Sequence, residues 1–113
     1  MEQHYKLSRV RELADNDMDF IQTLAEAFLE EVPVDAERLK KAVAEEDYYN
    51  TYQAAHKMKP TIDLFELGVL QDLIVVQDWG KFEKVGEDCS NELEIVLAAV
   101  EKASAELKED FNL

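Results

Sequence analysis

Residues 48–67 of the chain, YYNTYQAAHKMKPTIDLFEL, carry the pattern that decides the fold. Apolar or small side chains recur in this stretch at intervals of three and four residues, at Thr51, Ala55, Met58, Ile62 and Phe65. Such spacing is typical of one face of an amphipathic α-helix, because each residue turns about 100° around the helix axis. The stretch therefore predicts a helix that buries this face in a core.

The segments on either side predict further helices. Residues 6–14 and 21–43 show helical spacing of apolar residues, and Pro33 interrupts the second of these. We expect a kink or a restart at Pro33, since proline lacks an N–H and disfavours helical geometry at the preceding residue. Gly68 is a plausible helix stop. A shorter helix follows from Val69, and Trp79-Gly80 closes it.

The last segment, from Lys81 to about Asp110, has the most regular pattern. One apolar row repeats every seven residues, at Phe82, Cys89, Val96 and Ala103. Leu93, Val100 and Leu107 form the second row of the same heptad. The breaks between segments are short, which favours antiparallel neighbours. The predicted fold is all-α, an antiparallel four-helix bundle with one or two short accessory helices in a single domain over residues 1–113.

The composition narrows the class of protein. The chain has 113 residues, 47% of them hydrophobic, which suits one domain with a packed core. The 3 glycines and 2 prolines are too few for a typical β-sandwich, and the single cysteine excludes an internal disulfide framework. A net charge of −14 makes nucleic acid and anionic membranes poor partners. No apolar run is long enough for a membrane span and no apolar signal core is present, so we expect a cytoplasmic protein.

Signatures of enzymes and metal sites are absent from the sequence. It contains no glycine-rich phosphate loop and no HExxH, and its carboxylates follow solvated helix faces, so we expect no metal site. His4 lies in a terminus that we expect to be frayed. Cys89 falls on the apolar row of the last heptad and is expected to be a small buried hydrophobe.

His56 is the strongest chemical candidate. On the helical wheel it lies about 100° from Ala55, off the buried face, and Lys59 lies one turn further on the same flank. A neutral imidazole is a competent nucleophile near neutral pH, and a nearby cation stabilises the charge of a phosphoryl adduct. By themselves these two residues are a weak signal and favour an idle histidine on a charged helix face, since a surface histidine followed by lysine at i+3 often arises by chance.

The stretch from Ala55 to Lys59, AHKMK, resembles the AHxLK core of histidine-containing phosphotransfer (HPt) domains, the phosphorelay modules of two-component signalling. The resemblance extends along the chain, with a short first helix, a helix carrying the histidine and a long terminal helix. It implies that His56 is phosphorylated through Nε2 and that Lys59 stabilises the phosphoryl group. Met58 matches the family's leucine and Thr61 its small hydroxyl residue.

Two positions depart from the family pattern. Pro60 replaces a glycine that keeps the surface low for the docking partner, and Glu66 replaces a later glycine. We predict a local kink over residues 56–60, because Pro60 has no N–H to donate to the carbonyl of His56. These changes concern the docking geometry and leave the nucleophile and its lysine intact.

The resemblance implies a phosphorelay intermediate that takes a phosphoryl group from a receiver-domain aspartate and passes it to another. The implied partners are the receiver domains of response regulators and a hybrid sensor kinase. No ATP-dependent kinase activity and no cofactor in this chain are expected, since the receiver supplies Mg²⁺. We expect a monomer. The wheel suggests six docking residues around His56: Tyr49, Tyr52, Gln53, Lys57, Pro60 and Asp63.

Two other functions are compatible with the sequence. An HPt-like bundle that docks a partner without accepting phosphate would explain Pro60 and Glu66. A structural bundle that self-associates through the heptads of residues 82–107 is the third, although the same rows fit inside a monomer's core.

Overall fold

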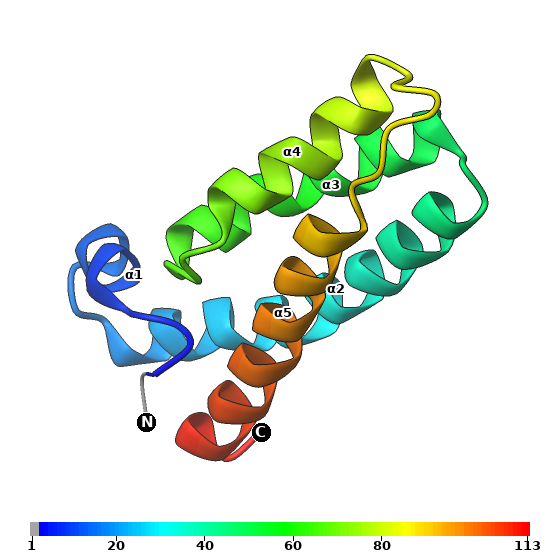
Figure 1. Cartoon of the computed structure of the whole chain (residues 1–113). Coiled ribbons are helices and arrows are strands. Elements are labelled where there is room, and N and C mark those ends of the chain that lie inside the picture. The colour runs from blue at the N-terminus through cyan, green and yellow to red at the C-terminus, as the bar shows by residue number, and fades with distance from the viewer. Residues whose placement is uncertain (1–2) are drawn as a thin grey trace.

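The computed structural model describes residues 3–113, and every regular element in this range is a helix (Figure 1). There are four long helices and one short one in these residues, which confirms the prediction of an all-α helical bundle. In chain order they are α1 (Ser8–Ala14), α2 (Met18–Ala44), α3 (Tyr48–Leu64), α4 (Leu70–Lys81) and α5 (Ser90–Phe111).

The four long helices pack in a closed arrangement. α3 lies between α2 and α4, while α5 packs on both α2 and α4 and completes the bundle (Figure 1). The short α1 packs against α2. The molecule is elongated, measuring 46 × 22 × 20 Å. No helix among residues 3–113 has the length and apolar character needed to cross a membrane.

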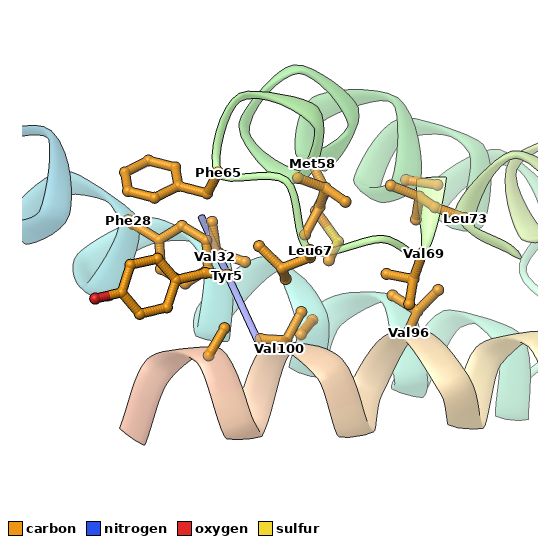
Figure 2. Packing of buried hydrophobic residues seen from close by; sticks show 14 of the residues in the cluster. Tyr5, Phe28, Val32, Met58, Phe65, Leu67, Val69, Leu73, Val96 and Val100 are labelled. Atoms are coloured by element: carbon orange, nitrogen blue, oxygen red, sulfur yellow. The ribbon is translucent and has the colours of Figure 1, made fainter. Parts of the chain in front are cut away.

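The core is built from all four long helices, the α3–α4 connection and the N-terminal segment (Figure 2). The rings of Phe28 on α2 and Phe65 after α3 lie 5.0 Å apart. Met58 points from α3 into the same cluster (Figure 2), and its side chain is 1% exposed. The apolar face predicted for residues 48–67 is therefore the face that α3 buries.

α2 runs through Pro33 as one helix, so of the two outcomes expected there, a kink or a restart, the restart does not occur. The residues Phe28, Val32, Ala36 and Leu39 form one continuous buried stripe on both sides of the proline. Proline inside a helix costs about 3 kcal/mol. Burial of several large apolar side chains at about 1.5–3 kcal/mol each offsets that cost, so tertiary packing keeps the helix whole.

α5 begins at Ser90, not at Lys81, so the first part of the heptad prediction was wrong. The backbone takes a left-handed conformation at Glu83 (φ 46°) and Gly86 (φ 86°), which ends helical geometry between α4 and α5. Phe82, the first residue of the predicted row, is 61% exposed. The rest of that row is buried from Cys89 onwards, so the repeat holds only for the residues that form the helix.

Neither of the two glycines predicted as helix stops is the residue at which its helix ends. Gly68 (φ 78°) lies in the α3–α4 connection, four residues after Leu64, the last residue of α3. Gly80 lies inside the last turn of α4 and is buried. A Cβ on Gly80 would lie 2.6 Å from the carbonyl oxygen of Tyr48 and 2.8 Å from the backbone nitrogen of Tyr52. Gly80 therefore allows α4 to pack directly on the first turns of α3.

Candidate functional site around His56

His56 lies in the middle of α3 with its side chain exposed to solvent. Its neighbours Ala54 and Ala55 are fully buried, and Ile62 is 1% exposed. The helical wheel thus placed the histidine correctly on the outer flank of α3. The imidazole is available to a reactant in solution or on a partner's surface.

The ring of His56 stacks on that of Tyr52, one turn earlier on α3. The ring centroids lie 5.6 Å apart and the planes are inclined by 25°. No hydrogen bond or ion pair to either imidazole nitrogen occurs within residues 3–113. Both nitrogens are therefore free to react in the described part of the molecule.

Lys59 lies one turn after His56 and is half-buried. Its ammonium group forms no ion pair with any residue between 3 and 113. A cation without a carboxylate partner is suited to stabilising negative charge that develops beside it. Lys59 therefore remains the best candidate for a group that binds a phosphoryl anion at His56.

Lys57, predicted as a docking residue, forms an ion pair with α2. Its Nζ lies 3.2 Å from Oδ1 of Asp35, whose side chain is 7% exposed. A buried carboxylate is costly without a partner, so this pair serves the packing of α3 on α2. The lysine side chain is still 56% exposed and lies at the edge of the His56 surface.

Sequence reasoning missed the burial of Asp35. In the first turn of a helix that restarts after Pro33, the carboxylate of Asp35 would normally be solvated. Because α2 is continuous, Asp35 falls beside Ala36 on the buried stripe, three residues after Val32 and four before Leu39. That spacing was the available signal for its burial.

Three of the predicted docking residues lie together beside His56. They line a hollow of about 410 Å³ between the start of α3 and the end of α4. Tyr49 is the most open of them, at 70% exposed. The hollow is lined by Tyr49, Tyr52, Gln53, Gly80, Lys81 and Glu83. The last three residues were missed, because a wheel of one helix says nothing about the helix packed beside it.

The remaining two docking candidates lie toward the other end of α3. Pro60 is exposed one turn after His56, and α3 continues through it as a helix. Asp63 pairs with Arg9, with Nη1 and Oδ2 2.8 Å apart. It also lines a second hollow, of about 650 Å³, formed with the N-terminal segment and the α3–α4 connection. Asp63 is thus engaged within the fold.

Gln77 is a buried polar residue that the sequence analysis did not single out. It lies on α4 one turn before Gly80, the residue that packs on the first turns of α3. Its side chain is 7% exposed, and its Oε1 has no hydrogen-bond partner in residues 3–113. Its position four residues after Leu73, on the apolar face of α4, was the signal that the sequence offered.

The N-terminal segment is tied to α5 and not frayed at His4. The backbone N–H groups of Gln3 and His4 each donate to Oε1 of Glu106 at 2.9 Å, and His4 Nδ1 contacts the same carboxylate. Burial acts to raise the pKa of Glu106, but these hydrogen bonds outweigh it, so the pKa lies below its usual value. Lys6 N–H donates to the carbonyl of Phe65 at 2.8 Å.

Cys89 is buried at the start of α5, as predicted. Burial, together with the nearby carboxylates of Asp88 and Glu92, raises the pKa of its thiol to about 11. A thiol with so high a pKa is a poor nucleophile. Within residues 3–113 no three His, Cys, Asp or Glu side chains are grouped so that they could hold a metal ion.

No family model, curated protein or solved structure matches this chain. The functional reading of the site therefore depends on the AHKMK stretch and on the geometry around His56.

Proposed function

We propose that this protein is a phosphorelay intermediate of the HPt kind, with His56 as the residue that carries the phosphoryl group. One observation supports the proposal above the others. An exposed imidazole without hydrogen-bond partners in residues 3–113 lies in the middle of a bundle helix, one turn before a lysine without an ion pair there.

The proposed reaction needs little from this chain beyond positioning and charge. A lone pair on an imidazole nitrogen attacks the phosphorus of a receiver's aspartyl phosphate. The bond between phosphorus and the carboxylate oxygen breaks, and the carboxylate leaves with the bonding electrons. Lys59 stabilises the charge on the phosphoryl oxygens, while the receiver supplies Mg²⁺. The reverse step passes the group to a second receiver.

The surface around His56 is suited to such a partner. Lys59 lies one turn after His56, and Lys81 lines the hollow that Tyr52 also lines, so both add positive charge to this surface in a chain with a net charge of −14. A receiver presents acidic side chains around its aspartate, so local attraction at this surface opposes the overall repulsion. We propose a cytoplasmic monomer that binds receiver domains of response regulators and of a hybrid sensor kinase in turn.

The test is phosphoryl transfer from a panel of phosphorylated receiver domains, with wild type beside His56→Gln. We expect the wild type to gain one acid-labile phosphoryl group in intact-mass spectra recorded at neutral pH, and the variant to gain none. Glutamine removes the nucleophilic nitrogen at an exposed position, so the fold should persist, as circular dichroism will check. A variant that still becomes labelled would disprove the role of His56.

A docking module that does not accept phosphate is the second candidate. The exposed ring of Pro60, one turn after His56, favours it, because this is where the family keeps the surface low. It predicts that a receiver binds wild type and His56→Ala with equal affinity, and that no phosphoryl adduct forms on either protein.

A further inference from the structure

We propose that Tyr52 is a positioning residue for His56, which holds the imidazole in one orientation by stacking against it. The inference rests on the proposed function and adds to it the residue that orients the nucleophile. The two ring centroids are 5.6 Å apart with planes inclined by 25°. Tyr52 precedes His56 by four residues, so consecutive turns of α3 place the two side chains next to each other.

The turn of α3 that carries Tyr52 is itself fixed by α4. A Cβ on Gly80 would lie 2.8 Å from the backbone nitrogen of Tyr52 and 3.1 Å from Cβ of Thr51, so α4 packs directly on this turn. Thr51 is buried, and its hydroxyl donates to the carbonyl oxygen of Asp47 at 2.8 Å. The tyrosine is therefore attached to a part of the helix that cannot move independently of the bundle.

Stacking on the ring of Tyr52 is the contact that can orient the imidazole of His56. Reactive histidines are usually oriented by a hydrogen bond to one ring nitrogen, and His56 has none within residues 3–113. An aromatic pair is expected to favour the stacked rotamer about 3- to 10-fold over the alternatives. A nucleophile held in one orientation reacts faster than one that samples several.

The aromatic ring of Tyr52, and not its hydroxyl, carries this role. The hydroxyl makes no hydrogen bond in the part of the chain that the structure describes. Tyr52→Phe should therefore preserve the effect. Tyr52→Leu should abolish it while keeping an apolar side chain beside the hollow.

The first measurement is spectroscopic and does not depend on phosphorylation. Proton–carbon NMR spectra of the His56 ring are compared in wild type, Tyr52→Phe and Tyr52→Leu. We expect the ring-current shift of the stacked imidazole in the first two proteins and its loss in the third. Ring protons of His56 that have the same shifts in all three proteins would overturn the proposal.

The second measurement is the rate of labelling by phosphoramidate, a small donor that needs no protein partner. The unprotonated imidazole nitrogen attacks phosphorus, the phosphorus–nitrogen bond breaks, and the nitrogen leaves as ammonia after taking up a proton. We expect wild type and Tyr52→Phe to react at the same rate, and Tyr52→Leu to react about 3- to 10-fold more slowly. Circular dichroism and thermal unfolding check that the three proteins are equally folded.

The results of these measurements distinguish a role of Tyr52 in orienting His56 from a role in binding the partner. Equal phosphoramidate rates in all three proteins, with slower transfer from receivers to Tyr52→Leu, would overturn positioning and assign Tyr52 to partner binding. Wild type that phosphoramidate does not label would also overturn it. If phosphoramidate labels wild type but no receiver does, the relay function fails, and the order of the three rates still decides the role of Tyr52.

Discussion

At the scale of single residues, the proposed site consists of an imidazole and an ammonium group on adjacent turns of one helix. His56 is exposed and Lys59 half-buried, and neither nitrogen-bearing group is paired within residues 3–113. Lys57 is the contrasting case, since its ammonium neutralises the buried Asp35. Two lysines two residues apart thus have different surroundings, because helical geometry points them at different neighbours.

A prediction for Lys59 follows from this contrast. Replacing it by alanine should slow phosphoryl transfer to His56 and shorten the lifetime of the adduct, because the developing charge loses its cation. A hydrogen bond to a charged group is worth about 1.5–3 kcal/mol, which corresponds to a rate lower by a factor of about 10 or more. Rapid-quench kinetics with a phosphorylated receiver measures both quantities.

Lys59→Arg is the matched control, since it keeps the positive charge at the same position. We expect it to retain most of the transfer rate. Equal rates for wild type and Lys59→Ala would show that Lys59 is an ordinary solvated residue of the helix.

At the scale of elements, the five helices in residues 3–113 end in the same way, with a residue in the left-handed conformation and without glycine. The residues at these positions are Asp15, Glu46, Glu66, Glu83 and Asn112, with φ between 46° and 55°. After α2, for example, Glu46 N–H donates to the carbonyl of Val43 and Asp47 N–H to that of Ala42. These bonds are those of the Schellman motif, which normally places glycine at this position.

Glu46→Gly should therefore stabilise the protein. Left-handed geometry costs a residue with a side chain about 1–2 kcal/mol, and a negative charge at a helix C-terminus is unfavourable as well. We expect the free energy of unfolding to rise by about 1 kcal/mol, measured by urea denaturation at neutral pH.

The adjacent residue provides the control. Glu45 carries the same charge but has φ −90°, a conformation without strain for an ordinary residue. Glu45→Gly should leave stability unchanged or lower it. Equal effects of the two substitutions would mean that charge, and not backbone conformation, determines the stability at this helix end.

Glu66, just after α3, stands where the HPt pattern has a glycine. Its φ of 52° shows that the backbone there has the geometry that glycine favours, although the residue is a glutamate. The departure from the pattern is thus one of side chain and not of backbone conformation. Glu66 also accepts a hydrogen bond from the backbone N–H of Arg9 at 3.4 Å, which gives its side chain a structural role.

At the scale of the whole molecule, the two ends of the chain are joined across the base of the bundle. Residues 3 and 4 donate to Glu106 on α5, and the hydroxyl of Tyr5 donates to Asp110 at 2.5 Å. Tyr5 is 1% exposed and belongs to the core shown in Figure 2. The N-terminal segment is therefore part of the folded unit.

This attachment should make the stability depend on pH in the acid range. The pKa of Glu106 is lower in the folded protein than its usual value of 4.5, so the unfolded chain binds the proton more tightly. The stabilising contribution is complete above about pH 5 and is lost as the pH falls through the folded-state pKa. We expect the backbone amides of residues 3–6 to lose hydrogen-exchange protection before the rest of the core as acid is added.

Glu106→Gln tests the assignment, with Glu94→Gln on the exposed side of α5 as the matched control. The first substitution should flatten the acid dependence of unfolding and weaken the N-terminal contacts at neutral pH. The second should leave both unchanged. An identical acid profile for Glu106→Gln and wild type would contradict the role of this carboxylate.

Much of this protein follows from its sequence alone. The spacing of Thr51, Ala55, Met58, Ile62 and Phe65 determined both that α3 is a helix and which face it buries, because side chains repeat every 3.6 residues. The same arithmetic determined that His56 is exposed and that Lys59 lies one turn away. Local periodicity is sufficient for such features, since they belong to a single helix.

Only the tertiary structure decided the features that join one helix to another. The continuity of α2 through Pro33, the ion pair of Asp35 with Lys57 and the position of Gly80 against α3 all depend on contacts between segments distant in the chain. At Pro33 the packing energy of the assembled core outweighs the local preference of proline against a helix interior. That energy comes from contacts between distant segments, so the residues around Pro33 alone do not predict it. For the same reason, the hollow beside His56 exists only once α4 has packed on α3.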